Sequence, residues 1–125
     1  MSGAERPATR LGRDGEAIAA GHLERKGWRI LERGFRTRTG EIDLVAAEGD
    51  LLVFVEVKTR SGLGCGRPAE AVDARKRGRI LRAAQLWLAR HGRAEAPCRF
   101  DVIEILAEAG APARIHHIPD AFQAE

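Results

Sequence analysis

Two neighbouring segments with the apolar character of buried strands carry charged residues two positions apart. Residues 40–46 read GEIDLVA and residues 54–60 read FVEVKTR. Because side chains alternate between the two faces of a strand, Glu41 and Asp43 share one face of the first segment. Glu56 and Lys58 likewise share one face of the second. Buried charges are costly unless they are paired or bind a metal, so the pattern predicts a site for a hard cation and a phosphate group.

The length of the turn between these segments decides whether their charges meet. Residues 48–50 (EGD) should join strands over residues 41–47 and 51–59 as a hairpin. Directly opposed residues point to the same face, and a slip of one residue reverses that arrangement. A loop of two or four residues would bring Asp43 together with Glu56 and Lys58, whereas a three-residue loop would separate them. The sequence permits either alternative.

The other predicted elements place this hairpin in a small α/β domain. Helices are predicted over residues 9–26 and 69–91, and further strands over 28–35, 99–106 and 114–118. The strand over residues 51–59 is apolar on both faces, which is typical of a central strand covered by helices. We therefore expect a disordered arm over residues 1–8 and, over residues 9–125, one domain with a mixed sheet flanked by helices.

Length and composition narrow the class of protein. A chain of 125 residues fits one domain with a hydrophobic core. Its apolar runs stay below the roughly 20 residues that span a bilayer, and its N-terminus lacks the apolar core of a signal peptide. We expect a cytoplasmic protein with no membrane partner. Cys65 and Cys98 show no disulfide framework and should be free thiols.

Charge is distributed in blocks along the chain. Residues 60–93 carry nine Lys or Arg against two acids, whereas residues 41–58 carry five acids and one lysine. Basic flanks could hold a polyanion while the acidic centre holds cations, and solvated surface charge is the alternative. The arginines that could bind nucleic acid are Arg60, Arg67, Arg75, Arg77 and Arg79. Each of them could contact a phosphate or simply be solvated, and both alternatives stay open.

Two residues outside the hairpin could join its charges. Glu16 lies on a small-residue face of the first predicted helix, where it would be buried against a partner or aimed at a metal. Surface exposure is the alternative, because Leu11 and Ile18 mark a competing apolar side. Lys76 lies one turn before Ile80 in the second helix and leans toward the buried side. The alternative for Lys76 is a lysine that snorkels to solvent from the helix edge.

These residues together resemble the PD-(D/E)XK nuclease superfamily, whose core order is α-β-β-β-α-β. More narrowly, the chain is similar to the YraN-like family of bacterial proteins, suspected endonucleases with a fold like that of archaeal Holliday-junction resolvases. The matching segments span nearly the whole chain and are Gly15-Glu16, residues 40–44 (GEIDL), residues 54–60, Lys76, residues 99–102 (RFDV) and residues 117–122 (HIPDAF). The resemblance implies a restriction-endonuclease-like fold.

The resemblance also implies roles for individual residues. Asp43, Glu56 and Lys58 would be catalytic, with Asp43 and Glu56 as ligands of Mg²⁺ or Mn²⁺. Glu16 would match the first-helix acid of the resolvase-like branch as a further ligand, and Glu41 and Lys76 would support the site. The sequence departs from the pattern at Ile42, where the superfamily has proline before the first acid, and at Gly34, where asparagine is expected.

The function that the resemblance implies is a metal-dependent endonuclease that hydrolyses phosphodiester bonds in DNA, branched or structured DNA included. A second hypothesis is a nucleic-acid-binding protein that keeps the fold with little or no cleavage. A third is an interaction protein whose acidic cluster is structural. The choice between DNA and RNA and the oligomeric state stay open, with a homodimer among the alternatives.

Overall fold

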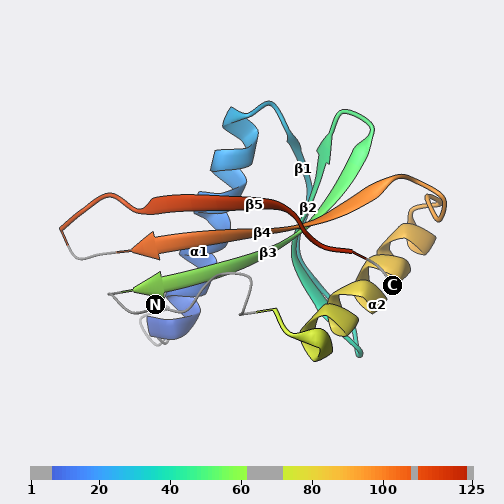
Figure 1. The fold of residues 1–125 in the computed structure, drawn as a ribbon, viewed down its shortest axis with the longest axis horizontal. Helices are drawn as coiled ribbons and strands as arrows, with labels where there is room; N and C mark the ends of the chain where they lie inside the picture. Colours follow the sequence, from blue (N-terminus) through green and yellow to red (C-terminus); the bar gives the residue numbers. More distant parts are fainter. Residues whose placement is uncertain (1–6, 62–71, 108–109, 124–125) are drawn as a thin grey trace, which may run out of the picture.

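The computed structural model describes residues 7–61, 72–107 and 110–123, which form two helices and five strands (Figure 1). In chain order the elements are α1 (Pro7–Arg25), β1 (Arg29–Arg36), β2 (Glu41–Glu48), β3 (Leu51–Ser61), α2 (Ala74–Arg90), β4 (Cys98–Ala107) and β5 (Arg114–Phe122). The predicted order of elements is confirmed. None of the described helices is long and apolar enough to cross a membrane.

The five strands form one mixed sheet in the order β1-β2-β3-β4-β5. Neighbouring strands are antiparallel except β3 and β4, which are parallel and are connected through α2. A parallel pair needs such a crossover connection, and a helix usually supplies it. The structure therefore has the restriction-endonuclease-like α/β fold that the sequence predicted.

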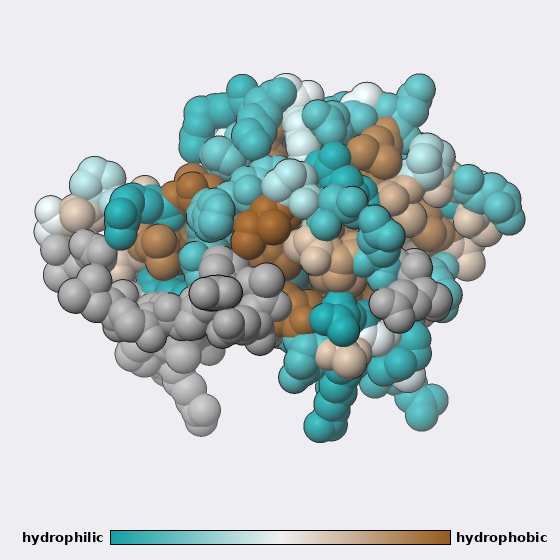
Figure 2. All heavy atoms as spheres, viewed as in Figure 1, coloured by the Kyte–Doolittle hydropathy of each residue, from teal (hydrophilic) through white to brown (hydrophobic). Residues whose placement is uncertain are grey.

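The helices cover opposite faces of the sheet. On one face, Ala19, Ala20 and Leu23 of α1 belong to a buried cluster that includes Leu44, Val53, Val55, Ile103 and Ile105. On the other face, Ile80, Ala83 and Trp87 of α2 pack in a cluster with Val45, Phe54, Phe100 and Val102. Residues 52–56 of β3 are all buried, which confirms the prediction of a central strand. In Figure 1, α2 lies toward one end of the sheet, and Figure 2 shows hydrophobic residues in the middle of this view, bordered by hydrophilic ones.

Helix boundaries differ from those predicted at both N-termini. Helix α1 begins at Pro7 rather than at residue 9, consistent with the preference for proline in the first turn of a helix. Helix α2 begins at Ala74 rather than at residue 69, because Asp73 caps it by accepting a hydrogen bond of 2.9 Å from the Lys76 backbone N–H. Residues 69–71, and residues 1–6 of the predicted arm, lie outside the described part of the chain, so the division into arm and domain stays a prediction.

Strand β5 extends four residues beyond its predicted end at residue 118. It contains Pro119, which is tolerated because β5 is an edge strand and has a partner on one side only. The register between β4 and β5 shifts between Phe100 and Val102, and Asp120 has a positive φ of 51°. Gly34 in β1 also has a positive φ, 64°, a conformation that glycine and asparagine tolerate best, so glycine preserves the geometry expected there.

A buried carboxylate fastens β5 to β4 on the face that α1 covers. Asp101 is fully buried and accepts hydrogen bonds from Arg99 Nε (2.8 Å), His117 Nε2 (2.7 Å) and the Asp120 backbone N–H (2.9 Å). Burial alone would raise the pKa of this carboxyl, but the hydrogen bonds from His117 and Arg99 lower it below its ordinary value. Asp101 is therefore ionised and fully paired, and it anchors the C-terminal strand.

Replacing Asp101 by alanine should lower the free energy of unfolding by about 3–5 kcal/mol, because Arg99 and His117 would lose their buried partner. Urea denaturation at pH 7 measures the loss. Glu24→Ala removes one acidic charge from an exposed position of α1 and should change stability by less than about 0.5 kcal/mol. Equal stabilities of the two variants would contradict the anchoring role of Asp101.

Candidate functional site

The β2–β3 hairpin adopts the register that gathers the charges. Glu48 pairs with Leu51, so the loop consists of Gly49 and Asp50 alone, and Leu44 pairs with Val55. Continuing this register by one position places Asp43 opposite Glu56. Of the two alternatives that the sequence permitted, the two-residue loop is the one observed.

Asp43 is half-buried and lies beside the buried Glu56. Its Oδ2 accepts a hydrogen bond of 2.7 Å from the Val57 backbone N–H, and its carboxyl group is also a hydrogen-bond partner of the Glu56 carboxyl. Burial and the negative charge of Glu56 raise the pKa of Asp43 to about 8, with a smaller contribution from Glu16. Two acids that share one site disfavour double ionisation, so this pair needs a proton or a cation between its oxygens.

Two lysines contact the buried Glu56 carboxylate at the same oxygen. Glu56 is 4% exposed, and its Oε2 lies 2.6 Å from Lys76 Nζ and 3.3 Å from Lys58 Nζ. Lys58 follows Glu56 by two positions on β3, whereas Lys76 reaches over from the first turn of α2. The predicted inward lean of Lys76 is thus confirmed, and the contact joins the central strand to the helix.

The two ammonium groups are in different electrostatic states. Burial and the neighbouring Lys76 lower the pKa of Lys58, although Glu56 opposes this shift. Burial would also lower the pKa of Lys76, but its hydrogen bonds to Glu56 and Lys58 raise it. The pKa is therefore lowered at Lys58 and raised at Lys76.

Glu16 is near this cluster without joining it directly. Burial raises the pKa of Glu16, Arg36 lowers it, and the charges of Glu41 and Glu56 raise it further. Within residues whose placement the structure describes, no three Asp, Glu, His or Cys side chains converge in a way that could hold a metal ion. Asp43 and Glu56 thus come together as a pair, and the role of Glu16 as a third ligand stays a prediction.

A cavity of about 270 Å³ opens next to the cluster and shares Lys76 with it. Glu41, Asp73, Arg75, Lys76, Arg79 and Ile80 line this cavity. It lies near the point where the residue before β2 meets α2, and there Gly40 packs so closely on the backbone of Arg79 that a Cβ atom would clash with the Arg79 carbonyl. Glu41 is exposed and lies 3.6 Å from Arg36 Nε.

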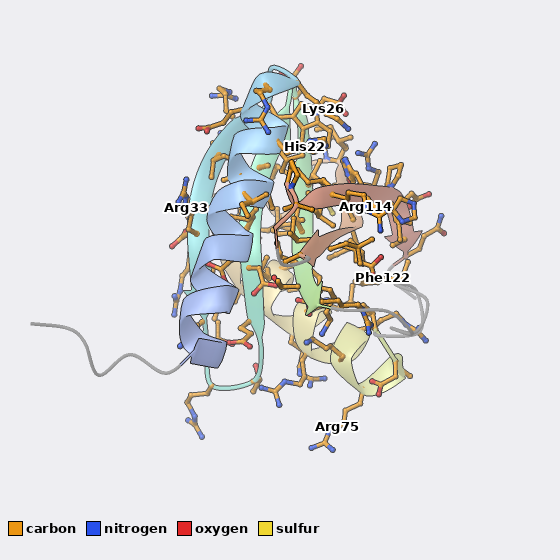
Figure 3. All side chains as sticks on the ribbon, turned by 90° about the vertical axis from the view of Figure 1, so that its left-hand side faces the viewer. His22, Lys26, Arg33, Arg75, Arg114 and Phe122 are labelled. Atoms are coloured by element: carbon orange, nitrogen blue, oxygen red, sulfur yellow. The ribbon has the colours of Figure 1, made fainter. Side chains whose placement is uncertain are left out.

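The predicted phosphate-binding arginines occupy different positions. Arg75 and Arg79 are four residues apart on one side of α2 and line the cavity, and Figure 3 shows the Arg75 side chain pointing away from the ribbon. Arg77 donates a hydrogen bond of 3.1 Å to the Val72 carbonyl. Arg60 is paired with Glu104 of β4 at 3.0 Å, a partner that the sequence analysis did not identify. Arg67 lies outside the described residues, as does Cys65, whereas Cys98 is a free and exposed thiol.

The paired acids have a donor set that fits a divalent cation. Mg²⁺ is commonly held by one or two carboxylates together with retained waters, and Asp43 and Glu56 supply two. Burial and the charge of Glu56 raise the pKa of Asp43 to about 8, so near neutral pH the pair keeps the positive charge of a proton. A divalent ion would supply that charge in place of the proton. The residues therefore fit a Mg²⁺ or Mn²⁺ site of two carboxylates.

The fold and this arrangement define the class of protein as restriction-endonuclease-like α/β proteins with an acid–lysine cluster around a buried glutamate of the central strand. Comparison with known sequences then identifies the family. Residues 15–105 match the family described as Uncharacterised protein family UPF0102, and the chain belongs to it. The predicted membership of the YraN-like family is thereby confirmed.

Several relatives match almost the full length of the chain. A UPF0102 protein of Rhodococcus jostii (strain RHA1) is 52% identical over 112 residues, which cover 90% of this chain and 95% of the relative. A UPF0102 protein of Symbiobacterium thermophilum is 50% identical over 115 residues, covering 92% and 98%. A UPF0102 protein of Anaeromyxobacter dehalogenans is 46% identical over 115 residues, covering 92% and 85%.

The raised pKa of Asp43 predicts that this residue costs stability at neutral and basic pH. The folded state retains a proton between the ordinary pKa of 3.8 and the folded value of about 8, so stability should fall as pH rises through this window. Asp43→Asn keeps an acceptor for the Val57 N–H and removes the titration. In EDTA, this variant should gain up to about 5 kcal/mol relative to the wild-type chain between pH 4 and pH 8. Urea melts at both pH values measure this difference, and a gain that is the same at both would contradict the assignment.

Proposed function

We propose that this protein is a Mg²⁺- or Mn²⁺-dependent endonuclease that hydrolyses phosphodiester bonds in DNA, including branched or structured DNA. The observation that carries the proposal is the pairing of half-buried Asp43 with buried Glu56, with Lys58 and Lys76 on one Glu56 oxygen. A sheet can stabilise its centre with apolar residues alone, and an acid pair with a raised pKa is costly there. Perturbed groups of this kind cluster at functional sites.

The chemistry of phosphodiester hydrolysis assigns a role to each group. Asp43 and Glu56 would hold the divalent ion, which when bound neutralises phosphate charge and lowers the pKa of a water molecule. Lys58, with its lowered pKa, would orient or deprotonate the attacking water and place positive charge near the phosphate oxygens. Arg75 and Arg79 would bind neighbouring phosphates along the cavity.

The second candidate function is nucleic-acid binding with little or no cleavage. The arginines at the cavity serve this function equally well, because phosphate contacts require only exposed positive charge. The Asp43–Glu56 pair favours the enzyme, since negative charge beside a phosphate weakens binding unless a cation intervenes. Cleavage and binding measured on the same variants separate the two functions.

Substitution of the acid pair should abolish cleavage and spare binding. With Mg²⁺ or Mn²⁺ present, the wild-type protein should cut at least one of linear, flapped and four-way DNA. Asp43→Ala and Glu56→Gln should each reduce the rate by about 10²-fold or more, because each removes a metal ligand. Gel assays under single-turnover conditions measure the rate, and filter binding measures affinity.

The exposed Glu24→Ala variant, purified in the same way, controls for contaminating nucleases and should cleave like the wild-type protein. Cleavage by Asp43→Ala at the wild-type rate would refute the catalytic role of the pair. DNA binding without any metal-dependent cleavage on all three substrates would support the second candidate function.

The positions of the arginines on α2 predict which of them bind DNA. Each phosphate contact contributes about −0.9 to the slope of log K against log salt, so Arg75→Ala/Arg79→Ala should flatten the slope by about 2 units. Arg77→Ala should change the slope little, since its guanidinium bonds the Val72 carbonyl. Fluorescence anisotropy at several salt concentrations measures the slope. Arg25→Ala/Arg29→Ala removes two exposed arginines elsewhere, and an equal effect of this control would show that only net charge matters.

A further inference from the structure

Lys76 occupies the place at the acid pair where positive charge is needed. Its ammonium lies 2.6 Å from Glu56 Oε2, closer than Lys58 does at 3.3 Å, although Lys76 comes from a different element. The partner oxygen is almost fully buried, so water can replace this contact only in part. Lys76 thus provides, from α2, part of the charge that a bound cation would otherwise provide.

A divalent ion on Glu56 would bring three cationic groups to one carboxylate. The repulsion among them is stronger in a poorly solvated site than in water, because every interaction between charges is less screened there. One ammonium must then move away or release its proton. Lys58 belongs to the central strand, and its side chain is 24% exposed, whereas the Lys76 side chain is 37% exposed and begins in the first turn of α2. Both lysines have the same flexible stem, so the greater exposure of Lys76 makes it the group that moves away from Glu56.

The cavity gives the displaced ammonium a place to go. Lys76 already lines it together with Arg75 and Arg79, and Glu41 and Asp73 supply the opposing charge. A third cation between the two arginines would strengthen this wall for a nucleic-acid phosphate. Metal binding at the acid pair and phosphate binding at the cavity would then share one side chain.

We propose that Lys76 is a positioning residue that neutralises the Asp43–Glu56 pair in the metal-free protein, is displaced by the divalent ion, and then contacts a phosphate of the nucleic acid. This inference rests on the proposed function, because it requires a metal at the acid pair. It adds that Lys76 competes with the metal and cooperates with the substrate. By linkage, metal and nucleic acid each increase the affinity for the other.

The chain suits a direct measurement, because it contains only three lysines, Lys26, Lys58 and Lys76. Reductive methylation of the wild-type protein, followed by mass spectrometry, reports how accessible each amine is. Adding Mg²⁺ should raise the methylation rate of Lys76 about 5-fold or more, since its ion pair with Glu56 is lost. Lys26, which contacts His117 at 3.0 Å, serves as the internal reference and should react at the same rate throughout.

Metal affinity provides a second test of whether Lys76 and the metal compete for Glu56. Mn²⁺ titration without nucleic acid, followed by electron paramagnetic resonance, should show about 10-fold tighter binding to Lys76→Met than to the wild-type protein. Arg82→Met removes the same charge from an exposed position on α2 and should bind Mn²⁺ as the wild-type protein does. The methylation measurement needs no variant and decides the matter if Lys76→Met fails to fold.

The outcomes separate this inference from the proposed function. Suppose that the wild-type protein binds Mn²⁺ and the Asp43→Ala variant does not. If Mg²⁺ then leaves the reactivity of Lys76 unchanged and Lys76→Met binds Mn²⁺ no more tightly than the wild-type protein, the inference is wrong and the proposed function stands. If neither the wild-type protein nor Lys76→Met binds Mn²⁺, both are wrong. Tighter binding by Lys76→Met together with Mg²⁺-dependent exposure of Lys76 supports the inference.

Discussion

The burial of the Glu56 carboxylate in the central strand is the constraint on which the site depends. At 4% exposure, this group needs compensating charge, and it receives it from its own strand through Lys58 and from α2 through Lys76. Asp43 adds a second acid from β2, whose pKa rises to about 8. Three elements thus converge on one carboxylate. Such a convergence of charges is costly in a sheet interior, and perturbed groups of this kind cluster at functional sites.

The hairpin and its charges could be predicted because both depend on short-range patterns. Alternation within β2 and β3 places charges two residues apart on one face, and the turn has only two registers to choose between. The buried character of β3 follows in the same way from its apolar residues on both faces. The choice between loop lengths needed the structure, since Glu48 could belong to either the loop or the strand.

Contacts between distant segments could not be predicted from local patterns. Lys76 meets Glu56 only because the crossover through α2 returns over β2 and β3, and the start of α2 at Asp73 depends on its capping hydrogen bond. Aspartate is a preferred residue at the N-cap of a helix, so Asp73 marked this boundary in the sequence, although the predicted helix began earlier, at residue 69. The pairing of Arg60 with Glu104 depends on the parallel β3–β4 register, which no sequence pattern fixes.

The central claim is that Asp43 and Glu56 together hold a divalent cation. Crystals soaked in Mn²⁺ and measured for anomalous scattering test it directly. The account predicts a peak at roughly 2.0–2.3 Å from an oxygen of each carboxylate, with the Lys76 ammonium withdrawn from Glu56. An ordered acid pair with no anomalous peak, and with Lys76 still on Glu56 at saturating Mn²⁺, would contradict it.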